Sequence, residues 1–215
     1  MPRKPRSKSQ TLPFHVTVRC NNGEPFPLPL EKAWPLFCHA LYEAVVLYDL
    51  KIHAAVLMPN HLHLVCSTPQ EGLDLVMKRV LQLFTQDLCR YSGRTGRIFS
   101  SRYFSKIIDS LDYYETVLKY VYRNPVRAKL VEQVEDYPFS TLHGQLGFAP
   151  SLLPLSIPVV PVRGVAKVTE LHTLLEWLNT PFPVEEESSI RRKLYLRCRN
   201  PSTKKSSPQN TEEDC

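Results

Sequence analysis

The alternation of hydrophobic and polar positions predicts strands and helices in the first half of the chain. Residues 15–20 alternate and are rich in β-branched side chains, which is typical of a strand. Residues 31–49 repeat apolar side chains at helical spacing and predict a helix. Two further strands are expected at 52–58 and 62–66, because the Pro-Asn pair between them is typical of a tight turn.

The same pattern continues further along the chain. Residues 72–91 carry one apolar face and predict a second helix, and residues 98–108 are expected to be mostly strand. Ser110 is a candidate N-cap for a helix over 111–124, and a last helix is expected at 168–178. This order of elements predicts an α+β fold, an antiparallel sheet with helices packed on one of its faces.

Polar and proline-rich segments border this region. Residues 1–13 form a basic, flexible tail, and residues 197–215 form a polar tail that we expect to be disordered. Proline is frequent in residues 149–163 and predicts an extended connector, so 149–196 is interpreted as this connector followed by a helical extension.

Composition narrows the class of protein. The 215 residues hold 27 Lys and Arg against 21 Asp and Glu, and the net charge of +6 permits a polyanionic partner without identifying one. No run approaches the ~18 apolar residues of a membrane span, and no apolar segment follows the basic N-terminus, so we expect a cytoplasmic protein without membrane contact. The six cysteines contain no C-x-x-C pair and are expected to be free thiols.

Two histidines on one predicted strand are the first candidates for chemistry. His61 and His63 are two positions apart, so their rings leave the same face, whereas Leu62 and Leu64 point to the other. Two adjacent imidazoles form half of a site for a divalent metal. The alternative is a pair of hydrogen-bonded histidines on a solvated sheet face, which the motif alone favours.

The second candidate pair lies near the end of the predicted helix over 111–124. Tyr120 and Asn124 are four positions apart and share a helix face, and Pro125 indicates that they lie on its last, open turn. An amide oxygen suits Mg²⁺ or Mn²⁺, and a tyrosine one turn away could attack what the metal polarises. The alternative is that Tyr120 packs in the core and Asn124 caps the helix.

Other tyrosines fit a nucleophile less well than Tyr120. Tyr122 lies about 200° around the helix, and Tyr113 is two turns away on a similar face. Tyr114 is less well aligned, and Tyr103 is expected on a strand, where it packs or stacks.

Together, the motifs M-P-N-H-x-H and Y-x-x-x-N-P-V-R-A resemble the REP-associated tyrosine transposases, an insertion-sequence 200-like group of the HUH single-tyrosine transposases. The resemblance covers about residues 13–143 in the right order. Further matching segments are His15–Arg19, Gly96–Phe99, Arg102–Tyr103 and Tyr137–Ser140.

The resemblance implies a ferredoxin-like catalytic domain over 14–148 that binds single-stranded or hairpin DNA of repetitive palindromes. His61, His63 and Asn124 would hold a divalent metal, Mg²⁺ or Mn²⁺. Tyr120 would attack the scissile phosphate, giving a 5′-phosphotyrosine link and a free 3′-OH. Related enzymes occur as monomers and as homodimers, and both states stay open here.

Basic side chains around these motifs are candidates to neutralise DNA phosphates, with an ordinary solvated surface as the alternative. The candidate DNA-binding residues are Arg19, Arg94, Arg97, Arg102, Arg123 and Arg127.

The chain departs from the family pattern at three positions. Cys20 and Lys129 stand where glycine is usual, and Phe139 replaces another aromatic residue. No departure removes a candidate ligand or Tyr120.

Two other functions stay open. One is a non-catalytic DNA-binding protein on the same fold, whose hairpin binding would survive Tyr120→Phe. The other is a metal hydrolase of small substrates, which would need further ligands such as Asp109, Asp112 or Glu115.

Overall fold

The structure is a computed structural model that describes residues 9–156 and 171–195. The chain divides into two units, Met1–Thr180 and Pro181–Cys215. The described part of the second unit contains helix α6 (Val184–Tyr195). All other elements below belong to the first unit, which carries the candidate site.

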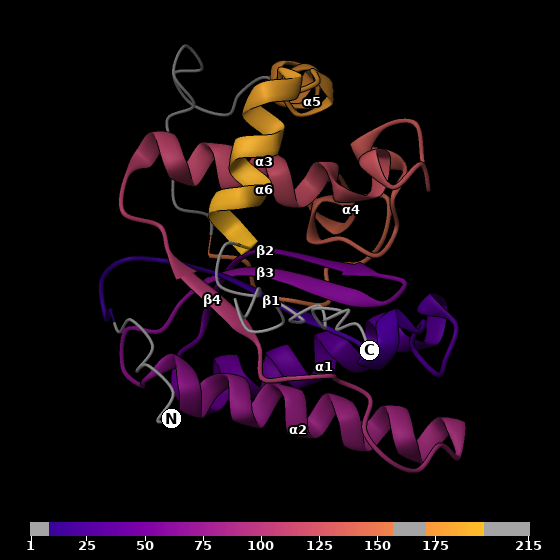
Figure 1. Cartoon of the computed structure of the whole chain (residues 1–215). Coiled ribbons are helices and arrows are strands. Elements are labelled where there is room, and N and C mark those ends of the chain that lie inside the picture. Colours follow the sequence, from indigo (N-terminus) through magenta and orange to yellow (C-terminus); the bar gives the residue numbers. More distant parts are fainter. Residues whose placement is uncertain (1–8, 157–170, 196–215) are drawn as a thin grey trace, which may run out of the picture. The chain divides into compact units, whose positions relative to one another are not determined.

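Four strands form one antiparallel sheet in the order β2-β3-β1-β4 (Figure 1). Helix α1 (Leu30–Tyr48) joins β1 to β2, and helix α2 (Leu73–Ser92) joins β3 to β4. This β-α-β-β-α-β order and strand arrangement are ferredoxin-like, so the predicted fold class is confirmed. The strands are β1 (Phe14–Arg19), β2 (Lys51–Met58), β3 (His61–Ser67) and β4 (Phe104–Ile107).

One face of the sheet forms the main hydrophobic core with α1 and α2. The register pairs Val16 with Leu64 and Val18 with Leu62, and all four side chains are buried on this face. The core continues into both helices, which lie together below the sheet in Figure 1. Burial of these apolar side chains is the main stabilising contribution to this layer.

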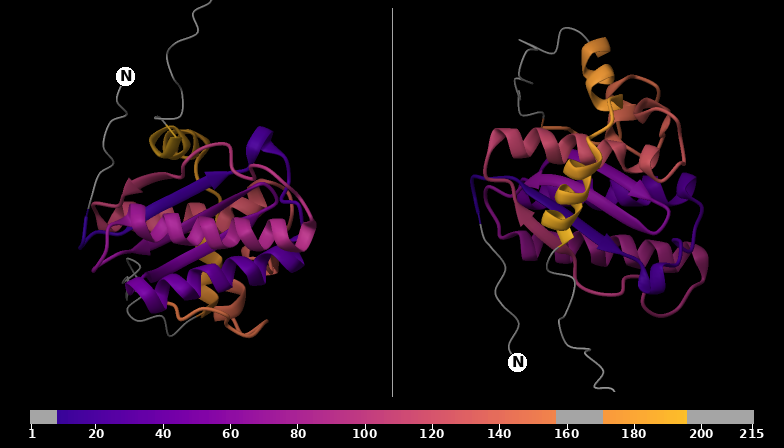
Figure 2. Two further views of the ribbon diagram at one scale, coloured as in Figure 1. Left: turned by 90° about the horizontal axis from the view of Figure 1, so that it is seen from below. Right: turned by 45° about the horizontal axis from the view of Figure 1, so that its top comes forward.

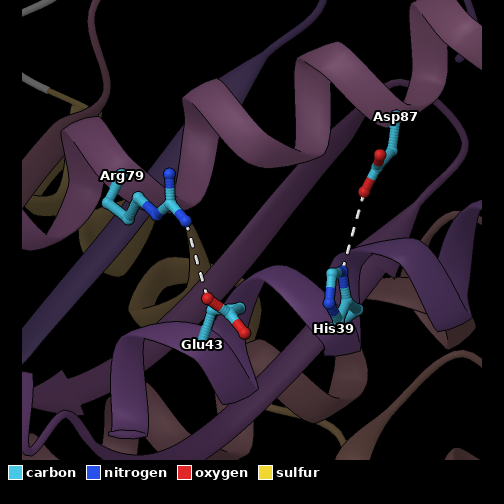
Figure 3. A network of polar contacts seen from close by, with 4 residues as sticks. All are labelled: His39, Glu43, Arg79 and Asp87. Atoms are coloured by element: carbon cyan, nitrogen blue, oxygen red, sulfur yellow. Dashed lines mark ion pairs between the residues drawn. The ribbon is translucent and has the colours of Figure 1, made fainter. Parts of the chain in front are cut away.

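Two polar contacts also link α1 and α2 (Figure 3). Arg79 lies 3.5 Å from Glu43, and the Nδ1 of His39 lies 3.7 Å from the Oδ2 of the buried Asp87. Such partly exposed pairs contribute about 1 kcal/mol or less each, so they orient the helices more than they stabilise them.

The opposite face of the sheet is covered by α3 (Leu111–Arg127), which lies above the sheet in Figure 1 and packs against β2 and β3. Figure 2 shows the same layering from two other sides. The prediction that helices cover one face only is therefore wrong. The polar residues of the strands suggested that this face is exposed to solvent, but the face that carries His15 and His63 is buried beneath α3.

Shorter elements complete the first unit. They are η1 (Asn21–Gly23), η2 (Val134–Asp136), α4 (Thr141–Gln145) and α5 (Leu171–Asn179). The proline-rich segment begins along β2, where Leu155 pairs with Ile52 and Leu153 is buried. This contact covers one part of the open edge of β2, and a pairing of Val56 with Ser140 covers another, at positions that would otherwise present unpaired backbone groups.

Several predicted element bounds need correction. Residues 98–103 are not a strand: Phe99 makes one isolated pairing with Cys20, and the exposed residues 100–102 interrupt a continuous ladder. The third helix runs through Pro125 to Arg127, beyond its predicted end at 124. The sequence pattern also missed α4 and α6.

Part of the predicted organisation falls outside the described residues, namely 1–8, 157–170 and 196–215. Among the described helices, none has the length and apolar character needed to cross a membrane. The four described cysteines are free thiols, and three of them, Cys20, Cys38 and Cys66, are buried.

Candidate active site

Three histidines come together on the sheet face beneath α3. The antiparallel register of β1 and β3 pairs Arg19 with His61 and Thr17 with His63. Because alternate residues of a strand share a face, His15 also lies on this side. The ring centroids of His61 and His63 are 5.0 Å apart, and those of His15 and His63 are 5.2 Å apart.

Tyr120 projects from α3 onto these histidines. The centroid of its ring lies 5.9 Å from that of His63 and 6.4 Å from that of His15, and both contacts are edge-on, at 87° and 84°. Tyr120 is 2 % exposed. His15, His61, His63 and Tyr120 are called the histidine–tyrosine cluster below.

Helix α3 directs Tyr120 inward because of how the helix begins and packs. The Ser110 side chain accepts a hydrogen bond from the backbone N–H of Tyr113, which confirms the predicted N-cap. Val117, Tyr120 and Val121 are buried at spacings of three and four residues, which is the period of one helix face.

The hydrogen bonds of His61 define which nitrogen of its ring is free. Its Nδ1 lies 2.7 Å from the Oδ1 of Asn60, while the Nδ2 of Asn60 donates to the carbonyl of Gly23 at 2.8 Å. An amide oxygen only accepts, so the proton of His61 is on Nδ1. The Nε2 of His61 then carries the lone pair that a metal needs.

His63 has one bonded and one unbonded ring nitrogen. Its Nδ1 lies 3.0 Å from the Nε2 of His15, and its Nε2 is buried without a hydrogen-bond partner among the described residues. A buried polar atom without a partner is costly, and a bound ligand would remove that cost. This unpaired nitrogen is the feature of the site that best fits a metal.

Burial and charge keep both candidate ligands neutral. Burial, followed by the charges of Arg19 and Arg127, lowers the pKa of His61 to about 4. Burial also lowers the pKa of His63 well below its ordinary value, with added effects from His61 and His15. Neutral imidazoles keep a lone pair for a metal at neutral pH.

Asn124 is buried and bonded within its own helix rather than at an open end. Its Nδ2 donates to the carbonyl of Tyr120 at 2.8 Å and lies 3.4 Å from that of Val121. The carbonyl of Val121 would normally bind the N–H of residue 125, which is the nitrogen of Pro125 and has no proton. The Asn124 amide therefore compensates for Pro125, and the helix continues.

Arg127 connects Asn124 with Tyr120. Its guanidinium donates to the Oδ1 of Asn124 at 3.1 Å and lies 5.4 Å from the centre of the Tyr120 ring. The amide oxygen of Asn124 has two lone pairs and the bond from Arg127 uses one of them, so a metal would share this oxygen with Arg127.

The available donors suit a hard divalent cation only if the amide takes part. Among the described residues, no group of three His, Cys, Asp or Glu side chains is placed to hold a metal. The donors of suitable chemistry are the two Nε2 atoms of His61 and His63 and the oxygen of Asn124, which is linked to the cluster through Arg127. No acidic group joins the two histidines, so the small-substrate hydrolase gains no support from the described structure.

The six candidate arginines have different surroundings. Arg19 and Arg127 both act electrostatically on His61 and so lie beside the cluster. Arg94 pairs with Glu24 at 2.9 Å, and Arg123 donates to the carbonyls of Leu178 and Asn179 at the end of α5.

Arg97 and Arg102 are exposed. Contact with DNA remains a prediction for all six arginines.

The other tyrosines belong to different surroundings from Tyr120. The hydroxyl of Tyr122 lies 3.0 Å from the Oγ1 of Thr141, and burial raises its pKa to about 12. The hydroxyl of Tyr114 lies 2.9 Å from the Nδ1 of His53, and that of Tyr103 donates to Asp74 at 2.8 Å.

Sequence reasoning missed two residues of this site. His15 and Asn60 were read as parts of motifs, and neither was assigned a role. Adjacency to His61 could have drawn attention to Asn60, but only the strand register brings His15 to His63.

Comparisons with known proteins bear on the fold of the chain and on the family that it resembles. No protein-family model matches the chain. It is 29 % identical over 136 residues to a REP-associated tyrosine transposase of Escherichia coli K12, covering 63 % of this chain and 78 % of that protein. It is 30 % identical over 108 residues to a Haemophilus influenzae protein provisionally given the same name, covering 45 % and 61 %.

The fold also matches a solved structure, that of a REP-associated tyrosine transposase bound to a REP hairpin. The TM-score is 0.59 at 24 % identity, over 73 % of this chain and 93 % of that chain. This likeness shows that the ferredoxin-like fold is shared with that structure. The chain is similar in sequence to REP-associated tyrosine transposases, as its motifs predict.

Proposed function

We propose that this protein cleaves and rejoins single-stranded or hairpin DNA through Tyr120. The observation that carries the proposal is the histidine–tyrosine cluster, in which the Tyr120 ring packs against His63 and His15 beside His61. The candidate nucleophile comes from α3 and the two histidine ligands come from β3, and their rings lie together although the two elements are distant in sequence.

In the proposed reaction the Tyr120 hydroxyl oxygen attacks the scissile phosphorus. A bond forms between this oxygen and the phosphate, the bond to the 3′ oxygen of the preceding nucleotide breaks, and the phenolic proton is lost as that 3′ oxygen becomes a hydroxyl. Attack by a 3′-OH on the 5′-phosphotyrosine link reverses these changes. The number of phosphoester bonds stays constant, so rejoining requires no nucleotide triphosphate.

The chain's own residues would hold and orient the reacting groups. His61, His63 and Asn124 would hold Mg²⁺ or Mn²⁺, which supplies polarisation of the phosphate when bound. Arg19 and Arg127 are basic side chains close to His61 and would neutralise the phosphate charge. Arg127 already donates to the oxygen of Asn124, so its guanidinium lies beside the third candidate ligand.

The proposed substrate is a DNA hairpin with single-stranded flanks. It follows from the E. coli relative and from the solved transposase that is bound to a REP hairpin. A net charge of +6 is compatible with such a polyanion.

Trapping of a covalent adduct tests the proposal. The full chain is incubated with a hairpin-flanked single strand and Mn²⁺, and products are separated under denaturing conditions. A 3′ label should shift with the protein and a 5′ label should not, because Tyr120 would carry the downstream 5′ phosphate. Tyr120→Phe should abolish the adduct without weakening DNA binding, and His61→Ala should abolish metal-dependent cleavage.

Tyr113→Phe is the matched control, because Tyr113 lies two turns earlier on α3. This variant should form the adduct like the wild type. Loss of the adduct in Tyr113→Phe but not in Tyr120→Phe would overturn the assignment of the nucleophile.

A non-catalytic DNA-binding function is the second candidate. The observation that favours it is the burial of Tyr120, which is 2 % exposed, so the nucleophile would have to become accessible. Tight hairpin binding by a wild type that forms no adduct would establish this alternative.

A further inference from the structure

His15 contacts the candidate metal ligand His63, but the proposed function gives His15 itself neither the role of ligand nor that of nucleophile. It lies on β1 and is fully buried, and its ring stacks on that of His63 at 5.2 Å with 10° between the planes. The Nε2 of His15 is 3.0 Å from the Nδ1 of His63, which is a hydrogen-bond distance. One proton therefore lies between the Nε2 of His15 on β1 and the Nδ1 of His63 on β3.

Two neutral imidazoles can make this bond in only two ways. Either the Nδ1–H of His63 donates to the Nε2 of His15, or the Nε2–H of His15 donates to the Nδ1 of His63. In the first arrangement the Nε2 of His63 carries a lone pair, and in the second it carries a proton.

The two outer nitrogens of the pair do not by themselves favour either arrangement, but a bound metal would. The Nδ1 of His15 and the Nε2 of His63 are both buried without a hydrogen-bond partner among the described residues. Each arrangement therefore leaves one buried donor and one buried acceptor unpaired. A cation at the Nε2 of His63 is compatible only with the first arrangement, because it needs the lone pair.

We propose that His15 is a positioning residue that accepts the Nδ1–H of His63 and thereby holds His63 as a metal ligand through Nε2. The inference rests on the proposed function, because it concerns the metal site of that function. His15 also packs edge-on against Tyr120, so the same side chain supports the ligand and the candidate nucleophile.

The second histidine of the site is held in the same manner. The Nδ1 of His61 donates to the Oδ1 of Asn60, so His61 also presents Nε2. His15 and Asn60 thus have the same role toward the two candidate ligands. Partners of this kind typically change metal affinity by 10- to 100-fold when they are removed.

The wild type alone provides a first test. The full chain with ¹⁵N-labelled histidine is titrated with Mg²⁺, and long-range ¹H–¹⁵N spectra report which nitrogen of each ring carries the proton. With Mg²⁺ bound, His63 should be protonated at Nδ1 and unprotonated at Nε2. A His63 ring protonated at Nε2 in the bound state would overturn the inference.

Variants of His15 provide a second test, with Mn²⁺ binding measured by titration calorimetry. His15→Phe keeps a planar ring but cannot accept a hydrogen bond, so Mn²⁺ should bind at least 10-fold more weakly. The side-chain oxygen of glutamine can accept, so His15→Gln should restore the affinity to within about threefold. A merely structural role would not separate these two variants in this way.

His53 offers a matched control, since it is a partly buried histidine of β2 whose partners are Tyr114 and Ser67. His53→Phe should bind Mn²⁺ like the wild type. Circular dichroism of each variant reports whether it is folded, and the Mg²⁺ titration of the wild type decides the matter if both His15 variants unfold.

The outcomes separate the inference from the proposed function. If the wild type binds Mn²⁺ and forms the Tyr120 adduct while His15→Phe binds Mn²⁺ equally well, the inference fails and the function stands. If the wild type binds no Mn²⁺ or Mg²⁺, the metal-dependent function fails and the inference fails with it.

Discussion

Asn124 shows how one side chain can serve both the fold and a candidate site. Its amide nitrogen satisfies helix carbonyls next to Pro125, and its oxygen accepts from Arg127. The sequence offered ligand and cap as alternatives for this residue. In the structure Asn124 does not cap the helix, because α3 continues to Arg127. Its amide nitrogen bonds to carbonyls within the helix, and its oxygen, which accepts from Arg127, is the candidate metal ligand.

Asn124→Ala should therefore lower the free energy of unfolding even without metal or DNA. The loss of buried hydrogen bonds predicts a destabilisation of about 1–2 kcal/mol, which urea denaturation would measure. Unchanged stability would show that the contacts of the Asn124 amide contribute nothing to α3.

Pro125→Ala provides the control for this change. Alanine restores the N–H that the carbonyl of Val121 lacks, so the double variant Asn124→Ala, Pro125→Ala should recover much of the lost stability. Metal binding should not recover, because the oxygen of Asn124 is still missing. Recovery of both properties would contradict a ligand role for Asn124.

The end of α3 shows why glycine is usual at position 129, where this chain has lysine. The N–H of Lys129 bonds to the carbonyl of Val126, and the N–H of Leu130 bonds to the carbonyl of Pro125. This pair of bonds is a Schellman motif, which places the residue after the C-cap in the left-handed region. Lys129 has φ +57°, where glycine is favoured and other residues are strained.

Lys129→Gly should therefore stabilise the protein, by roughly 1 kcal/mol, because the strain of a left-handed residue is relieved. Urea denaturation would detect the change as a higher midpoint. Cys20→Gly is the contrasting control at the other departure. Cys20 has φ −60° and is buried, so glycine removes packing there without relieving strain and should destabilise the protein. Equal effects at the two positions would contradict this explanation.

Element prediction succeeded where the signal was local. The helices α1 and α2 and strands β1, β2 and β3 lie within two residues of their expected positions, because periodicity and turn residues are properties of neighbouring amino acids. Residues 98–103 were mispredicted because apolar alternation does not specify whether a partner strand continues beside them.

At the scale of the whole molecule, the sheet has one apolar face and one histidine-bearing face, and both are buried. The second face holds three neutral histidines under α3, and His53 on β2 is partly buried. Burial of an ionisable ring favours its neutral form, so folding and protonation compete.

This competition predicts acid sensitivity of the metal-free protein. Burial lowers the pKa of His15 to about 3 and those of His53 and His61 to about 4, from an ordinary value of 6.5. The unfolded chain binds more protons below about pH 6.5, so stability is full above this pH and falls as the pH decreases toward 4. Each such histidine contributes a slope of roughly 1.4 kcal/mol per pH unit.

Urea denaturation at a series of pH values between about 7.5 and 4.5 would measure this slope. His53→Phe should reduce it by about one histidine's contribution. A free energy of unfolding that stays constant across this range would contradict the burial of neutral histidines.

The sequence by itself determined the order of the four strands and of α1, α2 and α3, the shared face of His61 and His63, and the one-turn spacing of Tyr120 and Asn124. Each of these follows from backbone periods of two or 3.6 residues, which act between near neighbours. Only the tertiary structure decided that α3 covers the histidine face, that His15 lies at hydrogen-bond distance from His63, and that Arg127 donates to the oxygen of Asn124. Strand register and layer packing set these contacts, and both depend on residues distant in the chain.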